Sequence, residues 1–137
     1  MRTIARTALG CVVAAAGAAA VSLAAAPSAG AAPSLCPALP GQASSQASCS
    51  AESGPTGLAL AITDNGGKAS STADNYAGPA AIALGPGATV TMNGIRPGLA
   101  IGIAGPGGEV VVDGENGPTC KGPSFAGDFQ TFKGCMN

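Results

Sequence analysis

The chain has 137 residues, a formal net charge of −1, 9% charged residues and 3% aromatic residues. So few cations, with no cluster among them, argue against a nucleic-acid surface. The sequence contains no histidine, which removes the usual general base and the commonest transition-metal ligand.

Residues 1–31 have the features of an export signal. Arg2 and Arg6 precede an uncharged apolar segment, residues 8–26, and the small residues that follow predict cleavage between Ala31 and Ala32. An uncleaved membrane anchor is the alternative, but the segment is mostly Ala and Gly, which are weak for stable spanning. We therefore expect no stable transmembrane span after signal removal. The mature chain of 106 residues keeps four basic residues against all seven acidic ones, a net charge of −3.

Four cysteines remain after processing: Cys36, Cys49, Cys120 and Cys135. An even number in a small exported chain predicts two disulfides, and the wide spacings without histidine make a zinc site the weaker alternative. Three pairings are allowed. We favour the two local pairs, because each would close a Gly/Ser/Pro-rich flank, against an arrangement that ties the N-terminal flank to the C-terminal one.

Residues 32–56 are rich in Ser, Ala and Pro, which predicts a flexible N-terminal flank. Residues 57–137 are then expected to form one β-rich domain. Short apolar runs separated by Gly, Pro and Asn predict strands at 58–62, 80–84, 88–92, 99–103 and 109–112. The polar segment 68–76 fits either an exposed edge strand or a loop.

Leu and Ile alternate with Ala and Gly along three of these runs, 58–62, 80–84 and 99–103. Because side chains alternate faces along a strand, we expect the large set to line the core and the small set to form a low-relief second face. Asn93-Gly94 and the Gly-Pro-Gly at 85–87 favour hairpins, and so an all-β, antiparallel sandwich or meander. The recurrence of strands about every 8 to 11 residues fits a β-roll or solenoid as the alternative.

Two resemblances follow from these patterns. Residues 81–88, AIALGPGA, resemble the repeat of the β-roll head domains of trimeric autotransporter adhesins, although the unit at 99–105 departs by an inserted residue. As a whole the chain resembles small exported four-cysteine proteins of uncharacterised function from high-GC Gram-positive bacteria, through its Ala-rich signal, flanking cysteines and strand array. These resemblances imply location and class, and no activity.

The aromatic residues gather in the C-terminal segment. Phe125, Phe129 and Phe132 are spaced as on one face of a short helix, with Ser124 as its N-cap. We expect these rings to plug the open end of the sheet; an exposed aromatic patch for a partner or lipid is the alternative.

Few residues suggest chemistry. Lys68 with Ser70 or Ser71 could form a Ser-Lys pair, but a solvated loop is the default for such spacing. Residues 113–117 form a partial calcium-loop pattern without the full ligand spacing, so an acidic turn is the default there. We assign no catalytic, cofactor-binding or metal residue.

The function we expect is therefore that of an exported, non-enzymatic structural or interaction component of the cell envelope or secretome, with an envelope partner or self-association. A soluble ligand-binding or inhibitor module is the first alternative. A small secreted hydrolase using carboxylates alone is the second.

Overall fold

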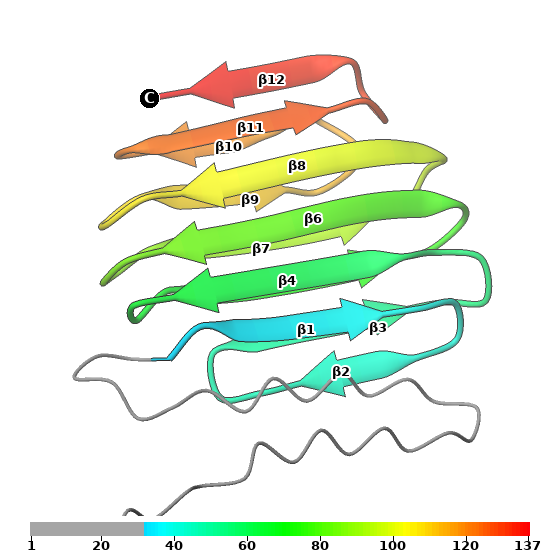
Figure 1. Ribbon diagram of the computed structural model, residues 1–137. Coiled ribbons are helices and arrows are strands. Elements are labelled where there is room, and N and C mark those ends of the chain that lie inside the picture. Colours follow the sequence, from blue (N-terminus) through cyan, green and yellow to red (C-terminus); the bar gives the residue numbers. More distant parts are fainter. Residues whose placement is uncertain (1–31) are drawn as a thin grey trace, which may run out of the picture.

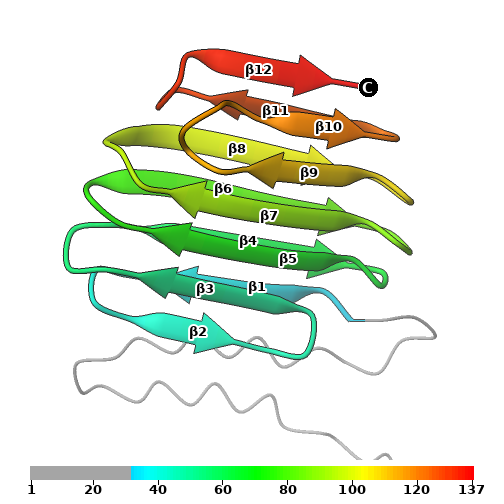
Figure 2. The ribbon, with the colours of Figure 1, turned by 180° about the vertical axis from the view of Figure 1, so that it is seen from behind.

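A computed structural model describes residues 32–137 as an all-β structure of two six-stranded sheets (Figure 1). Sheet A has the strand order β1-β4-β6-β8-β11-β12, and sheet B, seen from behind in Figure 2, has the order β10-β9-β7-β5-β3-β2. The strands are β1 (Ser34–Ala38), β2 (Ala43–Ser45), β3 (Cys49–Ser53), β4 (Ala59–Asp64), β5 (Lys68–Ala73), β6 (Ala77–Leu84), β7 (Thr89–Gly94), β8 (Gly98–Ala104), β9 (Glu109–Val112), β10 (Thr119–Lys121), β11 (Ser124–Asp128) and β12 (Lys133–Met136).

The central strands form a β-solenoid, because the chain crosses from one sheet to the other at every turn. Strands β3, β5, β7 and β9 pair in parallel in sheet B, and β4, β6 and β8 pair in parallel in sheet A. Successive coils are offset by 20 or 21 residues, as in the pairs Cys49↔Ala69 and Lys68↔Thr89. The all-β prediction and its solenoid alternative are thus confirmed.

The antiparallel meander is wrong for these central strands. The Gly-Pro-Gly at 85–87 forms a corner between the two sheets, and Asn93-Gly94 ends β7 just before the next such corner, so neither makes a hairpin between neighbours. Gly85 has a φ of 106°, and an added Cβ there would lie 2.6 Å from Pro106 of the next coil. Only glycine suits both that conformation and that stacking.

Antiparallel strands close the solenoid at both ends. Strands β1 and β2 pair with β4 and β3 at one end, and β10, β11 and β12 cover the other. Ordered strands therefore occupy residues 34–53, where the sequence predicts a flexible flank. Each strand there gains a ladder of hydrogen bonds from the coil it covers, which composition alone does not reveal.

The two disulfides join the sheets at these ends. Cys36 of sheet A bonds Cys49 of sheet B, with a Cα–Cα distance of 5.9 Å. Cys120 of sheet B bonds Cys135 of sheet A at 5.8 Å. The favoured local pairing is confirmed, and each bridge holds one end of the two-sheet stack together.

A buried glutamine supports the C-terminal end. The Oε1 atom of Gln130 accepts hydrogen bonds from the backbone N–H groups of Ile95 and Arg96, at 3.0 and 2.9 Å. Its amide nitrogen is buried without a hydrogen-bond partner. Gln130 thus ties the β11–β12 corner to the β7–β8 corner of the last full coil.

Small side chains line the core, and this overturns the prediction that the large set points inward. Thirteen of the nineteen buried apolar residues in the range 32–137 are alanine. An added Cβ on Gly102 would lie 2.8 Å from the Met92 sulfur and 2.9 Å from Val110, both on the inner face of sheet B. The inner side of β8 therefore carries Ala and Gly, and its Leu and Ile face away from the core.

The physical reason is the narrow space between the sheets. Sheet B fills the C-terminal half of that space with Val90, Met92, Val110 and Val112, all fully buried. Thr89 and Thr91 alternate with them on the outer side, which fixes the orientation of β7. A close-packed interior then leaves room only for Ala and Gly on the opposing strands of sheet A.

The expected export signal, residues 1–31 with its cleavage at Ala31, lies outside the described residues. Within residues 32–137, no helix is long and apolar enough to span a membrane.

Candidate interaction surface

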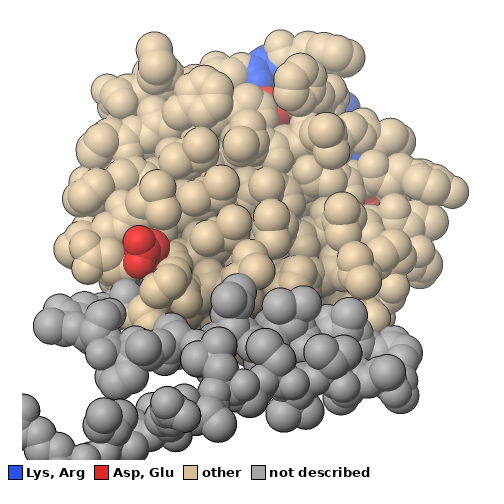
Figure 3. Space-filling model, in the orientation of Figure 1, with Lys and Arg blue, Asp and Glu red and all other residues tan. Residues whose placement is uncertain are grey.

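The outer side of sheet A is an apolar surface that extends over all six strands. We call it the apolar face and define it by the outward residues Leu35, Pro37, Leu60, Ile62, Gly78, Ala80, Ile82, Leu84, Leu99, Ile101, Ile103, Phe125, Gly127, Gly134 and Met136, with Leu58 and Phe129 at the strand ends. None of these side chains is polar or charged. Asp64, which ends the outward row of β4, is charged and lies at the margin of the face. Figure 3 shows the same face as a continuous uncharged surface, with charged side chains only near its margins.

Several of the largest side chains on the apolar face are open to solvent. Leu58 is 51% exposed, Leu99 67%, Phe129 62% and Met136 80%. Single exposed apolar residues are ordinary, but a continuous apolar patch on a folded protein marks an interaction surface.

The middle of the apolar face is ordered by side-chain stacking between parallel strands. Ile62, Ile82 and Ile103 lie directly beside one another in register across β4, β6 and β8. Each is half-buried by its neighbours. Such cross-strand contacts hold the rotamers in place, so the face is a preformed surface.

The C-terminal phenylalanines belong to this outer surface, so both the helix prediction and the plug prediction are wrong. Phe125 lies on β11, and Phe129 is the residue directly after that strand. The backbone N–H of Phe129 donates to the Leu99 carbonyl of β8 at 2.9 Å. The spacing misled because residues four apart share a face on a strand as well as on a helix. Phe132 follows in a left-handed corner with a φ of 56° and is 88% exposed. All three rings are exposed, as the alternative interpretation of an aromatic patch predicts.

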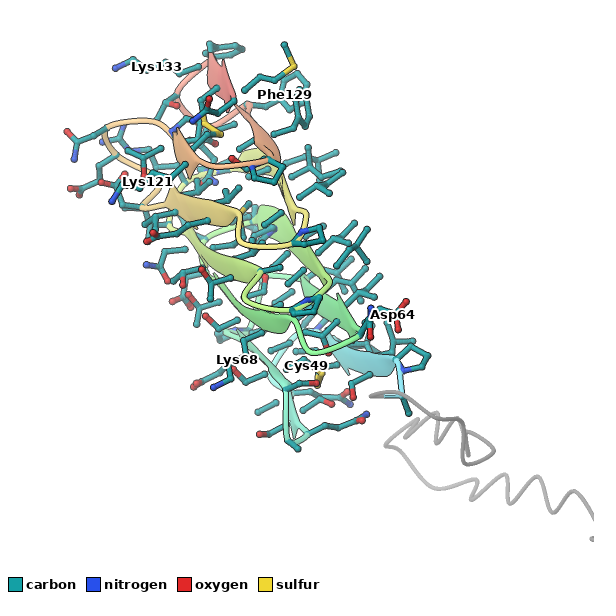
Figure 4. The ribbon with its side chains drawn as sticks, turned by 90° about the vertical axis from the view of Figure 1, so that its left-hand side faces the viewer. Cys49, Asp64, Lys68, Lys121, Phe129 and Lys133 are labelled. Atoms are coloured by element: carbon teal, nitrogen blue, oxygen red, sulfur yellow. A yellow bond between two sulfur atoms is a disulfide. The ribbon has the colours of Figure 1, made fainter. Side chains whose placement is uncertain are left out.

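The opposite surface, the outer side of sheet B, is polar. Its outward residues are mostly Ser, Thr and charged side chains, among them Ser50, Thr72, Thr91 and Lys68. In Figure 4, Lys68 and Lys121 point to the side opposite Phe129 and Asp64. The solenoid is therefore amphipathic, with one apolar and one hydroxyl-rich broad surface.

A shallow hollow of about 370 Å³ lies on this polar surface, beside the β2–β3 hairpin. It is lined by Ser45, Gln46, Ala47, Ser48, Cys49, Ser50, Lys68, Ala69, Ser70, Thr89, Val90 and Thr91. Lys68 and Ser70 share this outer side of β5. Because β5 is an inner strand of sheet B, between β7 and β3, both the edge strand and the loop predicted for this segment are wrong. Ser71 points the other way, where its buried hydroxyl donates to the Pro79 carbonyl at 3.1 Å.

The acidic segment 113–117 forms a turn around one carboxylate. Asp113 Oδ1 accepts hydrogen bonds from the backbone N–H groups of Glu115 and Asn116 at 2.9 and 2.8 Å, and Oδ2 accepts one from the Asn116 side chain. These hydrogen bonds, first those from Asn116, lower the pKa of Asp113 to about 2. In the part of the chain that the structure describes, no three His, Cys, Asp or Glu side chains are grouped to hold a metal ion.

No protein-family model, curated protein or solved structure matches this chain.

Proposed function

We propose that the protein is an exported, non-enzymatic interaction component of the cell envelope or secretome, and that it acts through the apolar face. The observation that carries this proposal is the unbroken apolar outer side of sheet A. A surface of Leu, Ile, Phe and Met exposed to water costs free energy until something covers it. The other broad surface of the same small solenoid is polar, so the apolar character is specific to one side.

The disulfides support an extracellular or envelope location for this function. Two bridges indicate an oxidising environment, which is extracellular or envelope-associated in most organisms. The signal-like residues 1–31 point to the same route. A rigid, stapled solenoid also presents the apolar face without an ordering cost on binding.

The test is a comparison of two double variants in the cells that produce the protein. Leu58→Glu with Leu99→Glu places two charges on the apolar face, two strands apart. Thr72→Glu with Thr119→Glu places two charges on the outer side of sheet B, three strands apart and outside the hollow. We expect wild type and the second variant to be retained in the envelope or in assemblies, and the first variant to appear free in the medium.

Two results would contradict the proposal. Equal distribution of both variants would show that the apolar face has no part in retention. A hydrolytic activity of the purified protein that disappears in Lys68→Ala or Ser70→Ala would place the protein among enzymes instead.

The hollow on sheet B supports a second candidate function, that of a soluble ligand-binding module. Its hydroxyl groups and the single ammonium of Lys68 are suited to a small polar or anionic ligand such as an acidic sugar. Binding of acidic oligosaccharides that is weakened by Thr91→Val and Lys68→Gln, and unaffected by charges on the apolar face, would favour this candidate.

A further inference from the structure

We infer that the occupant of the apolar face is a second copy of the same chain, packed face to face to give a four-sheet stack. This inference rests on the proposed function, because it names the partner of the surface proposed there. Sheets of this kind pack about 10 Å apart with interdigitating side chains. The apolar faces of two copies would therefore form an additional buried layer between the two solenoids.

The size of the apolar face fits a dimer interface. Six strands spaced about 4.8 Å apart, each contributing outward residues over roughly 17–20 Å, give a nearly flat area of about 500 Å² per copy. A face-to-face pair would bury at least about 1,000 Å², the lower bound for a specific protein interface. Homodimer interfaces are also more apolar than the rest of a protein's surface, as this face is.

The relief of the apolar face suits pairing with itself. Side chains protrude at Leu99, Phe129 and Met136, whereas the backbone lies open at Gly127, where an added Cβ would come no closer than 3.9 Å to the Ile101 side chain. A twofold axis lying in the interface places the projections of each copy over the other copy's face, so that one surface supplies both projections and hollows. Asp64, the last residue of β4, lies at the margin of the apolar face. It is the charged residue among the outward positions of the sheet A strands.

The distribution of charge favours a second copy over a lipid surface. Proteins that lie on bilayers border their apolar side with Lys and Arg, which contact anionic headgroups. Of the four cations in residues 32–137, Lys68 and Lys121 lie on the outer side of sheet B and point away from the apolar face (Figure 4). Lys133 donates to the Asn116 carbonyl at 3.1 Å and Arg96 lies at the β7–β8 corner, so no row of cations borders the apolar face. The excess of acidic residues in the mature chain also opposes adsorption to an anionic membrane.

The free sheet edges are poorer assembly sites than the apolar face. The edge strands of sheet B, β2 and β10, have three residues each, and β12 of sheet A has four. The remaining edge strand, β1, contains Pro37, and the Gln46 side chain donates to its Leu35 carbonyl at 2.9 Å. Short or interrupted edges discourage strand addition, so association is directed to the face.

The experiment is sedimentation equilibrium of the purified mature protein with its disulfides intact. We expect wild type to show twice the monomer mass at micromolar concentration. Leu58→Glu with Leu99→Glu should raise the dissociation constant at least about 100-fold, because each copy would bury two unpaired charges. Thr72→Glu with Thr119→Glu, which changes net charge equally on the outer side of sheet B, should leave the mass unchanged. Ala80→Glu, at the centre of the face on a half-buried position, gives a second test, and circular dichroism confirms that each variant is folded.

The outcomes separate this inference from the proposed function. A wild-type dimer that both double variants leave intact would place the interface elsewhere and overturn the inference. A wild-type monomer that binds alkyl-coated beads or lipid vesicles, with binding lost in the Leu58→Glu and Leu99→Glu variant, would overturn the dimer and leave the apolar face as the interaction surface. A wild-type monomer that binds neither would overturn both.

Discussion

Replacing Ala81 by leucine should destabilise the protein strongly, although its neighbour Ala80 accepts the same change. Ala81 is fully buried in β6, in register between Ala61 of β4 and Gly102 of β8. A Cβ on Gly102 would already crowd the side chains of sheet B, so the larger side chain at Ala81 enters a filled space. Overpacking of this kind costs about 1–3 kcal/mol or more. On the apolar face, Ala80→Leu should change the free energy of unfolding by no more than about 0.5 kcal/mol.

Urea unfolding followed by circular dichroism measures this difference, with both disulfides intact and the protein diluted below the range where copies associate. The two variants have the same composition and differ by one position in the same strand, so a gap of about 2 kcal/mol reports only which side faces the core. Ile82→Ala completes the set: an isoleucine in a core costs about 2–5 kcal/mol on truncation, whereas this outward residue should cost about 1 kcal/mol. A larger cost for Ala80→Leu than for Ala81→Leu would refute the assignment of the two faces.

Three further changes test the ends of the solenoid and its acidic turn. Replacing both cysteines of either bridge by alanine should cost about 3 kcal/mol, and hydrogen exchange should rise in the strands at that end only; a uniform rise would show that the bridges act on the whole fold. Gln130→Ala leaves the N–H groups of Ile95 and Arg96 without their acceptor and should cost about 1–3 kcal/mol in the same urea assay, with no loss if water replaces the amide. Because the pKa of Asp113 is lowered to about 2, its carboxylate stabilises the fold above an unfolded pKa of about 3.9, and this contribution is lost as the pH falls from about 4 to 2. Asp113→Asn should therefore flatten the thermal stability profile over that range, and an unchanged profile would contradict the turn geometry.

The strands could be predicted from the sequence because their alternation has period 2 whichever face is buried. The run predicted at 109–112 coincides with β9, and the run at 99–103 lies within β8. Which set points inward is a tertiary property, because it depends on the space left by the opposing sheet. The signal that was missed lies in β7, where Thr alternates with Val90 and Met92: one sheet that supplies large inward residues leaves the other only small ones.

The closing strands were harder to predict for a related reason. Residues 34–53 are polar and poor in β-branched residues, and they become strands because the ends of the coils offer unpaired hydrogen-bonding groups. Phe125 and Phe129 carry a spacing common to helix and strand, and only pairing of β11 with β8 selects the strand. The solenoid itself was open to prediction through the repeat of Gly-rich corners, since each corner must stack on the next.

The central claim is that the Leu, Ile and Phe side chains of sheet A face outward. Hydroxyl-radical footprinting with mass spectrometry tests it most directly, in protein diluted below the range where copies associate. We predict rapid modification of Leu99 and Phe129, and protection of Val90 and Met92, which are 1% and 0% exposed. Raising the concentration should then protect Leu99 and Phe129 as well. Rapid modification of Met92 together with protection of Leu99 at every dilution would mean that the large residues form the core, and would contradict the account.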